Sequence, residues 1–161
     1  MYSSPDFEAK LCTTGQLTNK LAALPRPLVF TNGCFDVLHR GHVTYLAQAR
    51  SLGASLIVGV NGDASVKRQG KGDDRPINAE MDRMAVLAAL QSVSLVIQFV
   101  EDTPLNLILA CHPDVLVKGG DWKPENIVGS TEVQGWGGSV HSIPFLHERS
   151  TTALLKKIRS L

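Results

Sequence analysis

The chain has 161 residues, which suffices for one ordinary domain with a buried core. Hydrophobic residues make up 43% of it and charged residues 19%, which is typical of a globular protein and excludes a disordered or fibrous chain. The formal net charge is +1, from 16 basic and 15 acidic side chains, and no block of like charge occurs, so nothing indicates a nucleic-acid or anionic-membrane surface.

The cysteines and the N-terminus predict a cytoplasmic protein. Cys12, Cys34 and Cys111 are odd in number and widely spaced, which favours reduced thiols over a disulfide framework. The N-terminal sequence MYSSPDFEAK has no basic region followed by an apolar run, so it does not resemble a signal peptide. No apolar stretch approaches the ~20 residues that a membrane-spanning helix needs.

The first predicted elements are a helical preface and a strand. Leucines at partial helical spacing in residues 6–24 predict a loosely defined helix, which Pro25 and Pro27 end. The apolar run 28–32 predicts a buried strand that is broken by Gly33.

A helix is predicted to follow from about Gly41 to Leu52. Its apolar spacing indicates that Val43, Leu46 and Ala47 face inward, and a glycine closes it.

The middle of the chain alternates between strands and helices. Residues 55–60 predict a second strand, and a charged, glycine-containing loop covers 67–74. Asn78 is suited to cap a helix that reaches Leu90, and residues 95–100 predict a third strand.

The last third continues the alternation. Thr103 and Pro104 predict a helix start, because proline suits the first helical position, and His112-Pro113 ends that helix. Strands are predicted at 115–117 and 139–143, and Ser150 is predicted to cap a last helix that ends near Ile158.

This order predicts an α/β fold, namely a single Rossmann-like domain with a five-stranded parallel sheet and helices on both faces. Residues 1–27 form an N-terminal helical extension in this interpretation, and residues 28–161 form the domain itself. Ligands of such sheets bind beyond the carboxyl ends of the strands, so the residues just after each strand are the candidates for function.

The strongest motif is Thr31 to His42, TNGCFDVLHRGH. A strand ends, a glycine allows a tight turn, and His39 and His42 open a helix three residues apart, on one face. Gly41 removes a side chain where a phosphate would approach, and the helix start offers unpaired N–H groups and a positive dipole end. The pattern favours polyphosphate chemistry. Two alternatives are a pair of surface histidines and a zinc site that adds Cys34, for which no fourth ligand has convincing spacing.

Three further segments follow predicted strands or begin helices. Lys118 is expected to face a polyphosphate from a strand beside the first one, and Gly119 and Gly120 would let the backbone pass close to a nucleotide. The alternative is a solvated lysine before a flexible turn.

The hydroxyls in the segment Arg149-Ser150-Thr151-Thr152 suit a second phosphate-binding site, although capping alone explains Ser150 equally well. The loop 67–76 either is a solvated charged loop or holds a sugar phosphate through Lys71 or Arg75.

The chain resembles a known family. GCFDVLHRGH matches the HxGH nucleotidyltransferase superfamily, and TNGCFDVLHRGH, KGDDRP, VLVKGGDW and STTALLKKI together resemble the D-glycero-β-D-manno-heptose 1-phosphate adenylyltransferases over residues 28–158. This resemblance implies that ATP and heptose 1-phosphate give ADP-heptose and pyrophosphate, with Mg²⁺ bridging phosphate oxygens. A separate kinase is then expected to supply the 1-phosphate, because only 27 residues precede the first strand.

The resemblance implies roles for individual residues. Attack by a phosphate dianion needs no general base, so catalysis reduces to alignment and charge stabilisation. The expected catalytic residues are His39, His42 and Lys118. The expected nucleotide-binding residues are Asn32, Gly33, Cys34, Phe35, Gly41, Gly119, Asp121, Ser150, Thr151 and Thr152. The expected sugar-phosphate residues are Asp36, Asn61, Asp63, Lys71 and Arg75, and no metal ligand from the protein is expected. We expect a homo-oligomer, a dimer or larger, with no nucleic-acid or membrane partner.

Three other functions stay open on the sequence. A glycerol 3-phosphate cytidylyltransferase is disfavoured because those enzymes carry an RTEGIST-type segment where this chain reads LHERSTT. Another adenylyltransferase, such as pantetheine-phosphate adenylyltransferase, is disfavoured by VLVKGGDW. A nucleotide-binding sensor without turnover is disfavoured by His39, His42 and Lys118.

Overall fold

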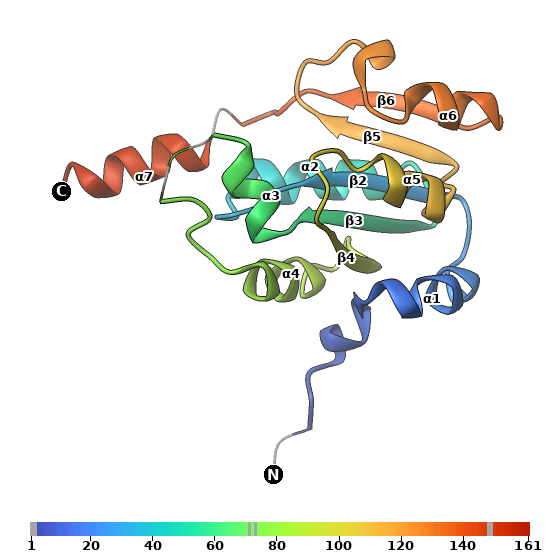
Figure 1. Cartoon of the computed structure of the whole chain (residues 1–161), viewed down its shortest axis with the longest axis horizontal. Helices are drawn as coiled ribbons and strands as arrows, with labels where there is room; N and C mark the ends of the chain where they lie inside the picture. The colour runs from blue at the N-terminus through green and yellow to red at the C-terminus, as the bar shows by residue number, and fades with distance from the viewer. Residues whose placement is uncertain (1–2, 71, 73, 148–149) are drawn as a thin grey trace.

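The computed structural model describes residues 3–70, 72, 74–147 and 150–161. Its centre is a parallel sheet in the order β1-β4-β3-β2-β5-β6, with helices on both faces (Figure 1). The strands are β1 (Leu11–Cys12), β2 (Leu28–Gly33), β3 (Ser55–Asn61), β4 (Leu95–Phe99), β5 (Val115–Gly119) and β6 (Ser139–Ile143). The helices are α1 (Leu17–Ala23), α2 (Arg40–Arg50), α3 (Asp63–Arg68), α4 (Glu80–Ala88), α5 (Leu105–Cys111), α6 (Ser130–Gly135) and α7 (Thr151–Arg159), with 3₁₀ turns η1 (Asp6–Lys10), η2 (Thr14–Gln16) and η3 (Pro124–Asn126).

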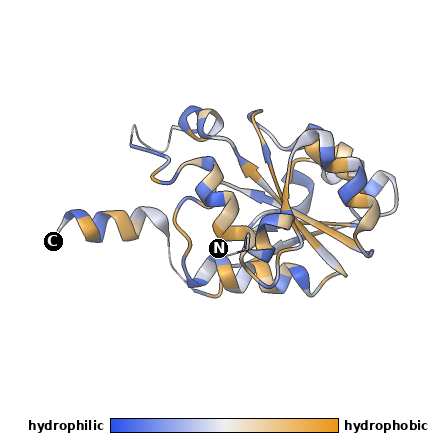
Figure 2. Ribbon diagram, turned by 90° about the horizontal axis from the view of Figure 1, so that it is seen from below, coloured by the Kyte–Doolittle hydropathy of each residue, from blue (hydrophilic) through white to orange (hydrophobic). Residues whose placement is uncertain are grey.

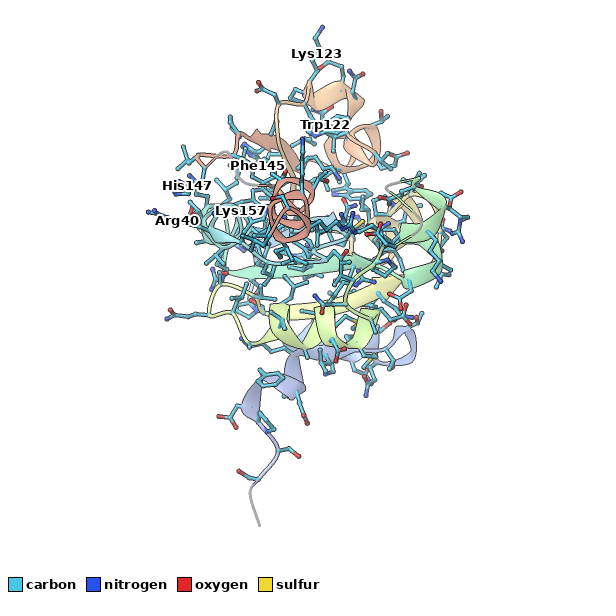
Figure 3. The ribbon with its side chains drawn as sticks, turned by 90° about the vertical axis from the view of Figure 1, so that its left-hand side faces the viewer. Arg40, Trp122, Lys123, Phe145, His147 and Lys157 are labelled. Atoms are coloured by element: carbon cyan, nitrogen blue, oxygen red, sulfur yellow. The ribbon has the colours of Figure 1, made fainter. Side chains whose placement is uncertain are left out.

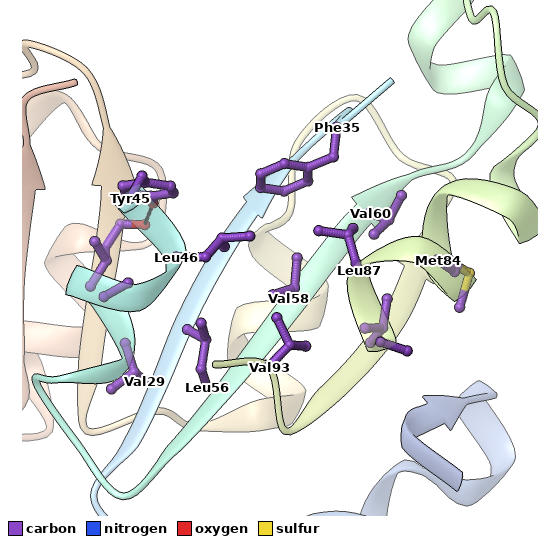
Figure 4. Close-up of a cluster of buried hydrophobic side chains, with 14 of the residues drawn as sticks. Val29, Phe35, Tyr45, Leu46, Leu56, Val58, Val60, Met84, Leu87 and Val93 are labelled. Atoms are coloured by element: carbon purple, nitrogen blue, oxygen red, sulfur yellow. Dashed lines mark hydrogen bonds between the residues drawn. The ribbon is translucent and has the colours of Figure 1, made fainter. Parts of the chain in front are cut away.

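Alternate strand residues build two apolar cores. Val29 and Val58 point to one face, where they pack with Leu46 of α2 and Leu87 of α4 (Figure 4). The neighbouring strand residues point to the other face and pack against α1, α5 and α6. Because successive side chains of a strand point to opposite sides, a strand buried on both faces needs apolar residues at nearly every position, as β2 and β3 have.

The α/β class and the parallel sheet are confirmed, but the sheet has six strands instead of five. The additional strand is β1, whose Leu11 and Cys12 pair with Val96 and Ile97 of β4. It lies in the segment 6–24 that was predicted to be helical. Two residues carry no alternating pattern, so only their position beside β4 makes them a strand.

Two details of the predicted helices are wrong. In α2, Val43 is 43% exposed and Ala47 is exposed, whereas Tyr45 and Ala49 are buried beside Leu46. Several apolar residues occur on both sides of this helix, and the direction in which it crosses the sheet decides which side is covered.

The second correction concerns the start of α4. Ala79 occupies the N-cap position, and Asn78 instead donates from its side-chain Nδ2 to the backbone oxygen of Asp36, at 2.7 Å. The predicted loop 67–74 also begins later than expected, because Lys67 and Arg68 belong to α3.

The order of the strands indicates at which edge of the sheet a ligand would bind. After β4 the chain crosses over β2 to form β5 on its other side, so the strand order reverses between β2 and β5. The prediction that these two strands lie side by side is confirmed. A ligand of a parallel sheet binds at the carboxyl ends of such a pair. Among the described residues, no helix combines the length and apolar character needed to span a membrane.

Candidate active site

A cleft of about 290 Å³ opens at the carboxyl ends of β2 and β5. Its walls come from the loop after β2, the start of α2, the end of β5, the segment after β6 and the start of α7. The lining residues are Asn32, Gly33, Cys34, Phe35, Asp36, His39, His42, Tyr45, Arg75, Lys118, Gly119, Phe145, Ser150, Thr151 and Thr152. The tertiary structure therefore brings together three segments that are more than 30 residues apart and that the sequence had singled out separately.

The two histidines stack on each other at the start of α2. His39 is the N-cap residue, and its ring centroid lies 3.8 Å from that of His42, with 20° between the ring planes. Phe35 contacts His42 edge-on at 5.4 Å. Phe35 itself has φ of 47°, a left-handed conformation that non-glycine residues rarely adopt, and such strained positions cluster at functional sites.

Gly41 makes room for the His39 ring. A Cβ at position 41 would lie 3.0 Å from both Nδ1 and Cε1 of His39, and 3.3 Å from the backbone oxygen of His147. We expected this glycine to clear space for a phosphate. In the structure this space is occupied by the His39 imidazole, and Gly41 is not among the residues that line the cleft.

His42 is a half-buried imidazole that is neutral near pH 7. Burial, and to a smaller extent the neighbouring His39, lower the pKa of His42 to about 4. Its Nδ1 is inaccessible to solvent and makes no hydrogen bond to any residue that the structure describes. Buried polar nitrogens ordinarily have a partner, so this atom is an exception among the buried polar groups.

The opposite wall consists of glycine backbone under two aromatic rings. A Cβ at Gly119 would lie 2.8 Å from Cζ of Phe145 and 3.2 Å from Cε2 of Tyr45, and Gly120 has φ of 109°. The two rings meet edge to face, with centroids 5.6 Å apart. Lys118 lies at this end of β5 and lines the cleft. Gly119 thus makes room for the two rings, and the approach of a nucleotide to Gly119 and Gly120 stays a prediction.

Tyr45 and Phe145 were not among the residues predicted from the sequence. Tyr45 lies three residues after His42, on the same face of α2, and Phe145 follows β6 directly, so helical spacing and the position after a strand were usable signals. The Tyr45 hydroxyl lies 2.5 Å from Oγ1 of Thr31, and burial raises the pKa of Tyr45 well above its usual range. This contact anchors the ring to β2.

Hydroxyl groups at the start of α7 form the third wall. Ser150 caps the helix by accepting a hydrogen bond from the backbone N of Ala153 at 3.0 Å, as predicted. Thr151 donates to the backbone oxygen of Val37 at 3.2 Å, which ties α7 to the loop before α2. Arg149 lies outside the described residues.

A buried ion pair closes the floor of the cleft. Arg75 Nε lies 2.5 Å from Oδ2 of Asp36, and the Asp36 carboxylate also accepts from the backbone N–H groups of Ile77 and Asn78. Burial by itself would raise the pKa of Asp36, but these hydrogen bonds and the Arg75 charge outweigh it and leave the pKa below its usual value. Both residues line the cleft, with their charges already paired.

Other predicted residues lie outside the cleft. Asn61 is buried and donates to Oγ of Ser65 at 3.1 Å, and Asp63 pairs with the buried Arg83 at 2.7 Å. Asp121 is exposed and does not line the cleft, and Lys71 is not among the described residues.

The zinc alternative would require several ligating side chains close together. The described residues contain no group of three or more His, Cys, Asp or Glu side chains able to hold a metal ion. Cys34 lies instead with its Sγ 3.3 Å from Oε1 of Gln69. The arrangement can hold an anionic ligand by hydrogen bonds from imidazole, hydroxyl and backbone groups and by the charge of Lys118.

Comparisons with known sequences agree with one another. Residues 30–157 match the family model described as cytidylyltransferase-like. The chain is 57% identical over 159 residues to the D-beta-D-heptose 1-phosphate adenylyltransferase of Bordetella bronchiseptica, with 98% of each chain covered. It is also 48% identical to the bifunctional protein HldE of Geotalea uraniireducens. The matched region covers 99% of this chain but only 33% of that protein.

Solved structures share the fold. A lipopolysaccharide core biosynthesis protein from Thermoplasma volcanium superposes with a TM-score of 0.62 at 28% identity, covering 76% of this chain and 98% of that one. A pantothenate synthetase from Thermus thermophilus has the same TM-score at 17% identity, over 91% of this chain and 70% of that one. The second likeness concerns the fold alone.

Proposed function

The chain belongs to the cytidylyltransferase-like family and, within it, to the heptose 1-phosphate adenylyltransferases, and we propose that it converts ATP and D-glycero-β-D-manno-heptose 1-phosphate to ADP-heptose and pyrophosphate. It is a nucleotidyltransferase. The single observation that carries the substrate assignment is the 57% identity over 98% of both chains to an enzyme of that name. The cleft supports it, because three separate segments present phosphate-binding groups to one space.

The chemistry requires alignment and charge stabilisation. An oxygen of the sugar phosphate forms a bond to the α-phosphorus of ATP while the bond to the bridging oxygen of the β-phosphate breaks, and pyrophosphate leaves in line. His42, neutral and half-buried, donates a hydrogen bond to an α-phosphate oxygen, with His39 beside it. Lys118 neutralises charge that builds up on the same group. Such donors are effective because they are already in position and shielded from water.

The hydroxyls of Ser150, Thr151 and Thr152 hold the β- and γ-phosphates at the start of α7. This end of the helix supplies unpaired N–H groups and the positive end of its dipole. Pyrophosphate therefore departs toward α7, and the attacking group approaches from the opposite direction.

Mg²⁺ enters with ATP in this proposal. Asp36, whose carboxylate lines the cleft, already has Arg75 and two backbone N–H groups as partners, so Mg²⁺ would be bound mainly through ATP. When bound, it neutralises charge on the phosphates. We further propose that the enzyme is cytoplasmic and works as a homo-oligomer; the odd, widely spaced cysteines support the first point.

Pyrophosphate release with a panel of substrates tests the assignment. ATP or CTP is paired with heptose 1-phosphate, hexose 1-phosphates, glycerol 3-phosphate and pantetheine phosphate. We expect ATP with heptose 1-phosphate to give the highest kcat/KM, well above CTP. Equal or faster turnover with CTP would overturn the adenylyltransferase assignment, and no turnover with any pair would favour a binding protein.

A further inference from the structure

A second hollow adjoins the cleft on the side of α7. Its volume is about 250 Å³, several times the ~30 Å³ that one water molecule occupies in the liquid. Its walls come from α7 and from Asp74 and Arg75, which precede α4. Arg75 and Thr152 line both the hollow and the cleft, so the two spaces meet at these residues. From there the hollow continues along α7 toward the end of the helix.

One face of α7 lines the hollow with polar side chains. Thr152, Lys156 and Arg159 lie at positions i, i+4 and i+7, which share one side of a helix, and all three line the hollow. The neighbouring Lys157 lies on a different side of the helix and does not line it. Figure 3 looks along α7 from its C-terminal end and labels Lys157 as an exposed side chain. Of two consecutive lysines, therefore, only the first belongs to the hollow.

The hollow contains more positive than negative charge. Arg75, Lys156 and Arg159 line it as cations, and Asp74 lines it as a carboxylate. Arg75 is already paired with the buried Asp36, and Arg159 pairs with Asp74. Lys156 makes no hydrogen bond or ion pair with any residue in the described part of the chain. Its ammonium group is therefore a positive charge in the hollow that no described carboxylate offsets.

The reaction sends a multiply charged anion toward this hollow. In the proposed mechanism, pyrophosphate departs from the α-phosphorus toward the hydroxyls of Ser150 and Thr151. The hollow begins at the next residue, Thr152, and a hollow lined by unbalanced positive charge attracts an anion. Pyrophosphate can then move along one face of α7, from the hydroxyls of the first turn to the ammonium group of Lys156.

We propose that this hollow is an exit site for pyrophosphate, in which Lys156 binds the ion after its bond to the α-phosphorus has broken. The inference rests on the proposed function for the direction in which pyrophosphate leaves. ATP keeps its terminal phosphates at the hydroxyls of residues 150–152, so Lys156 contacts the released product and not the bound substrate. A lysine suits this role, because its flexible stem carries a point charge that needs no fixed geometry. Free pyrophosphate should consequently inhibit the enzyme.

Binding of inorganic pyrophosphate tests the assignment. In calorimetric titrations at constant Mg²⁺, Lys156→Gln should bind pyrophosphate about tenfold more weakly than the wild type, equivalent to ~1.4 kcal/mol, because the lost charge faces several charges of the ion. The inhibition constant of pyrophosphate in the forward reaction, followed as nucleotide-sugar formation, should rise by the same factor. The KM for ATP should stay within about threefold.

Lys157→Gln is the matched control. It removes the same charge from the adjacent position of α7, outside the hollow, and should leave the affinity for pyrophosphate within about twofold of the wild type. An equal loss in the two variants would show only a general effect of net charge and would overturn the exit site.

Asp74→Asn should change the affinity in the opposite direction. This substitution removes a carboxylate from the wall of the hollow and the charged partner of Arg159. The hollow becomes more positive, so pyrophosphate should bind about threefold more tightly. A pair that only holds α7 against the segment before α4 predicts the reverse. Weaker binding in Asp74→Asn would therefore contradict an anion site.

The outcomes separate this proposal from the proposed function, because the calorimetric probe contains neither sugar nor nucleoside. If the wild type turns over ATP and heptose 1-phosphate but Lys156→Gln binds pyrophosphate as tightly as the wild type, the exit site is wrong and the function stands. Equal losses of affinity for ATP and pyrophosphate would also overturn the exit site, since the hollow would then belong to the ATP site. If Lys156→Gln loses pyrophosphate affinity alone but heptose 1-phosphate is no substrate, the exit site stands and the acceptor assignment fails.

Discussion

Asp36 and Arg75 form a buried ion pair across 39 residues of sequence, with 2.5 Å between Oδ2 and Nε. The pair joins the loop after β2 to the segment before α4. Because Asp36 also holds the backbone N–H groups of Ile77 and Asn78, a single carboxylate fixes the shape of the floor of the cleft.

Removing one partner of this pair should destabilise the fold strongly. Arg75→Ala leaves a buried carboxylate without its counter-ion, and we expect the free energy of unfolding to fall by ~3–5 kcal/mol in urea titrations. Arg68→Ala is the matched control, because Arg68 pairs with Asp102 at 2.6 Å but both side chains are largely exposed, and it should cost only ~0–1 kcal/mol. Equal losses for the two variants would contradict the structural role of the Asp36–Arg75 pair.

His42→Ala should separate catalysis from binding. In the proposed mechanism this imidazole contacts the α-phosphate more strongly as charge develops, so its loss should lower kcat by ~10²–10³. The affinity for ATP, measured by calorimetry, should change by less than about tenfold. A variant that binds ATP far more weakly but turns over normally at saturation would make His42 a uniform binding group.

The lowered pKa of His42 predicts a pH dependence of stability. The unfolded chain protonates this imidazole near its ordinary value of 6.5, whereas the folded protein does so near pH 4. Unfolding therefore takes up a proton in this window, so the contribution of His42 to stability is complete above about pH 6.5 and is lost as the pH falls toward 4. Urea titrations at several pH values should show a steeper decline for the wild type than for His42→Ala. Parallel curves would show that His42 titrates normally.

Ser150→Asp should distinguish capping from phosphate binding. Aspartate caps a helix about as well as serine, so α7 should keep its protection from hydrogen exchange. In the proposed mechanism the added negative charge would face the triphosphate, and we expect kcat/KM to fall roughly 10²-fold. Ser160→Asp places the same charge at the other end of α7 and should leave activity nearly unchanged. If Ser150→Asp remains active, Ser150 serves the helix alone.

Helix α7 shows why this test is informative. No residue of α7 is buried, and the helix extends from the body with apolar and polar residues both visible along it (Figure 2). Its contacts with the body lie at its two ends: Ser150 caps the first turn and Thr151 bonds to the loop before α2, and Arg159 of the last turn pairs with Asp74.

Local sequence pattern determined the class of the fold and most of the cleft. Continuous apolar runs bounded by glycine and proline predicted the strands from 28 onward, because a strand covered on both faces must be apolar throughout. The rule that ligands bind after the strands then singled out Asn32 to His42, Lys118 and Gly119. Ser150 was recognisable as a cap because capping is a contact within four residues.

Only the tertiary structure decided which residues complete that cleft and which serve the fold. Leu11 and Cys12 form a strand because β4 lies beside them. Asn78 does not cap α4, because its side chain donates to the backbone oxygen of Asp36, 42 residues away. Asp63 was expected to meet the sugar phosphate, but in the structure it pairs with the buried Arg83. Each outcome depends on a partner distant in sequence. A periodic pattern records which side of an element is apolar, whereas the partner that a polar side chain reaches is set by how the elements pack.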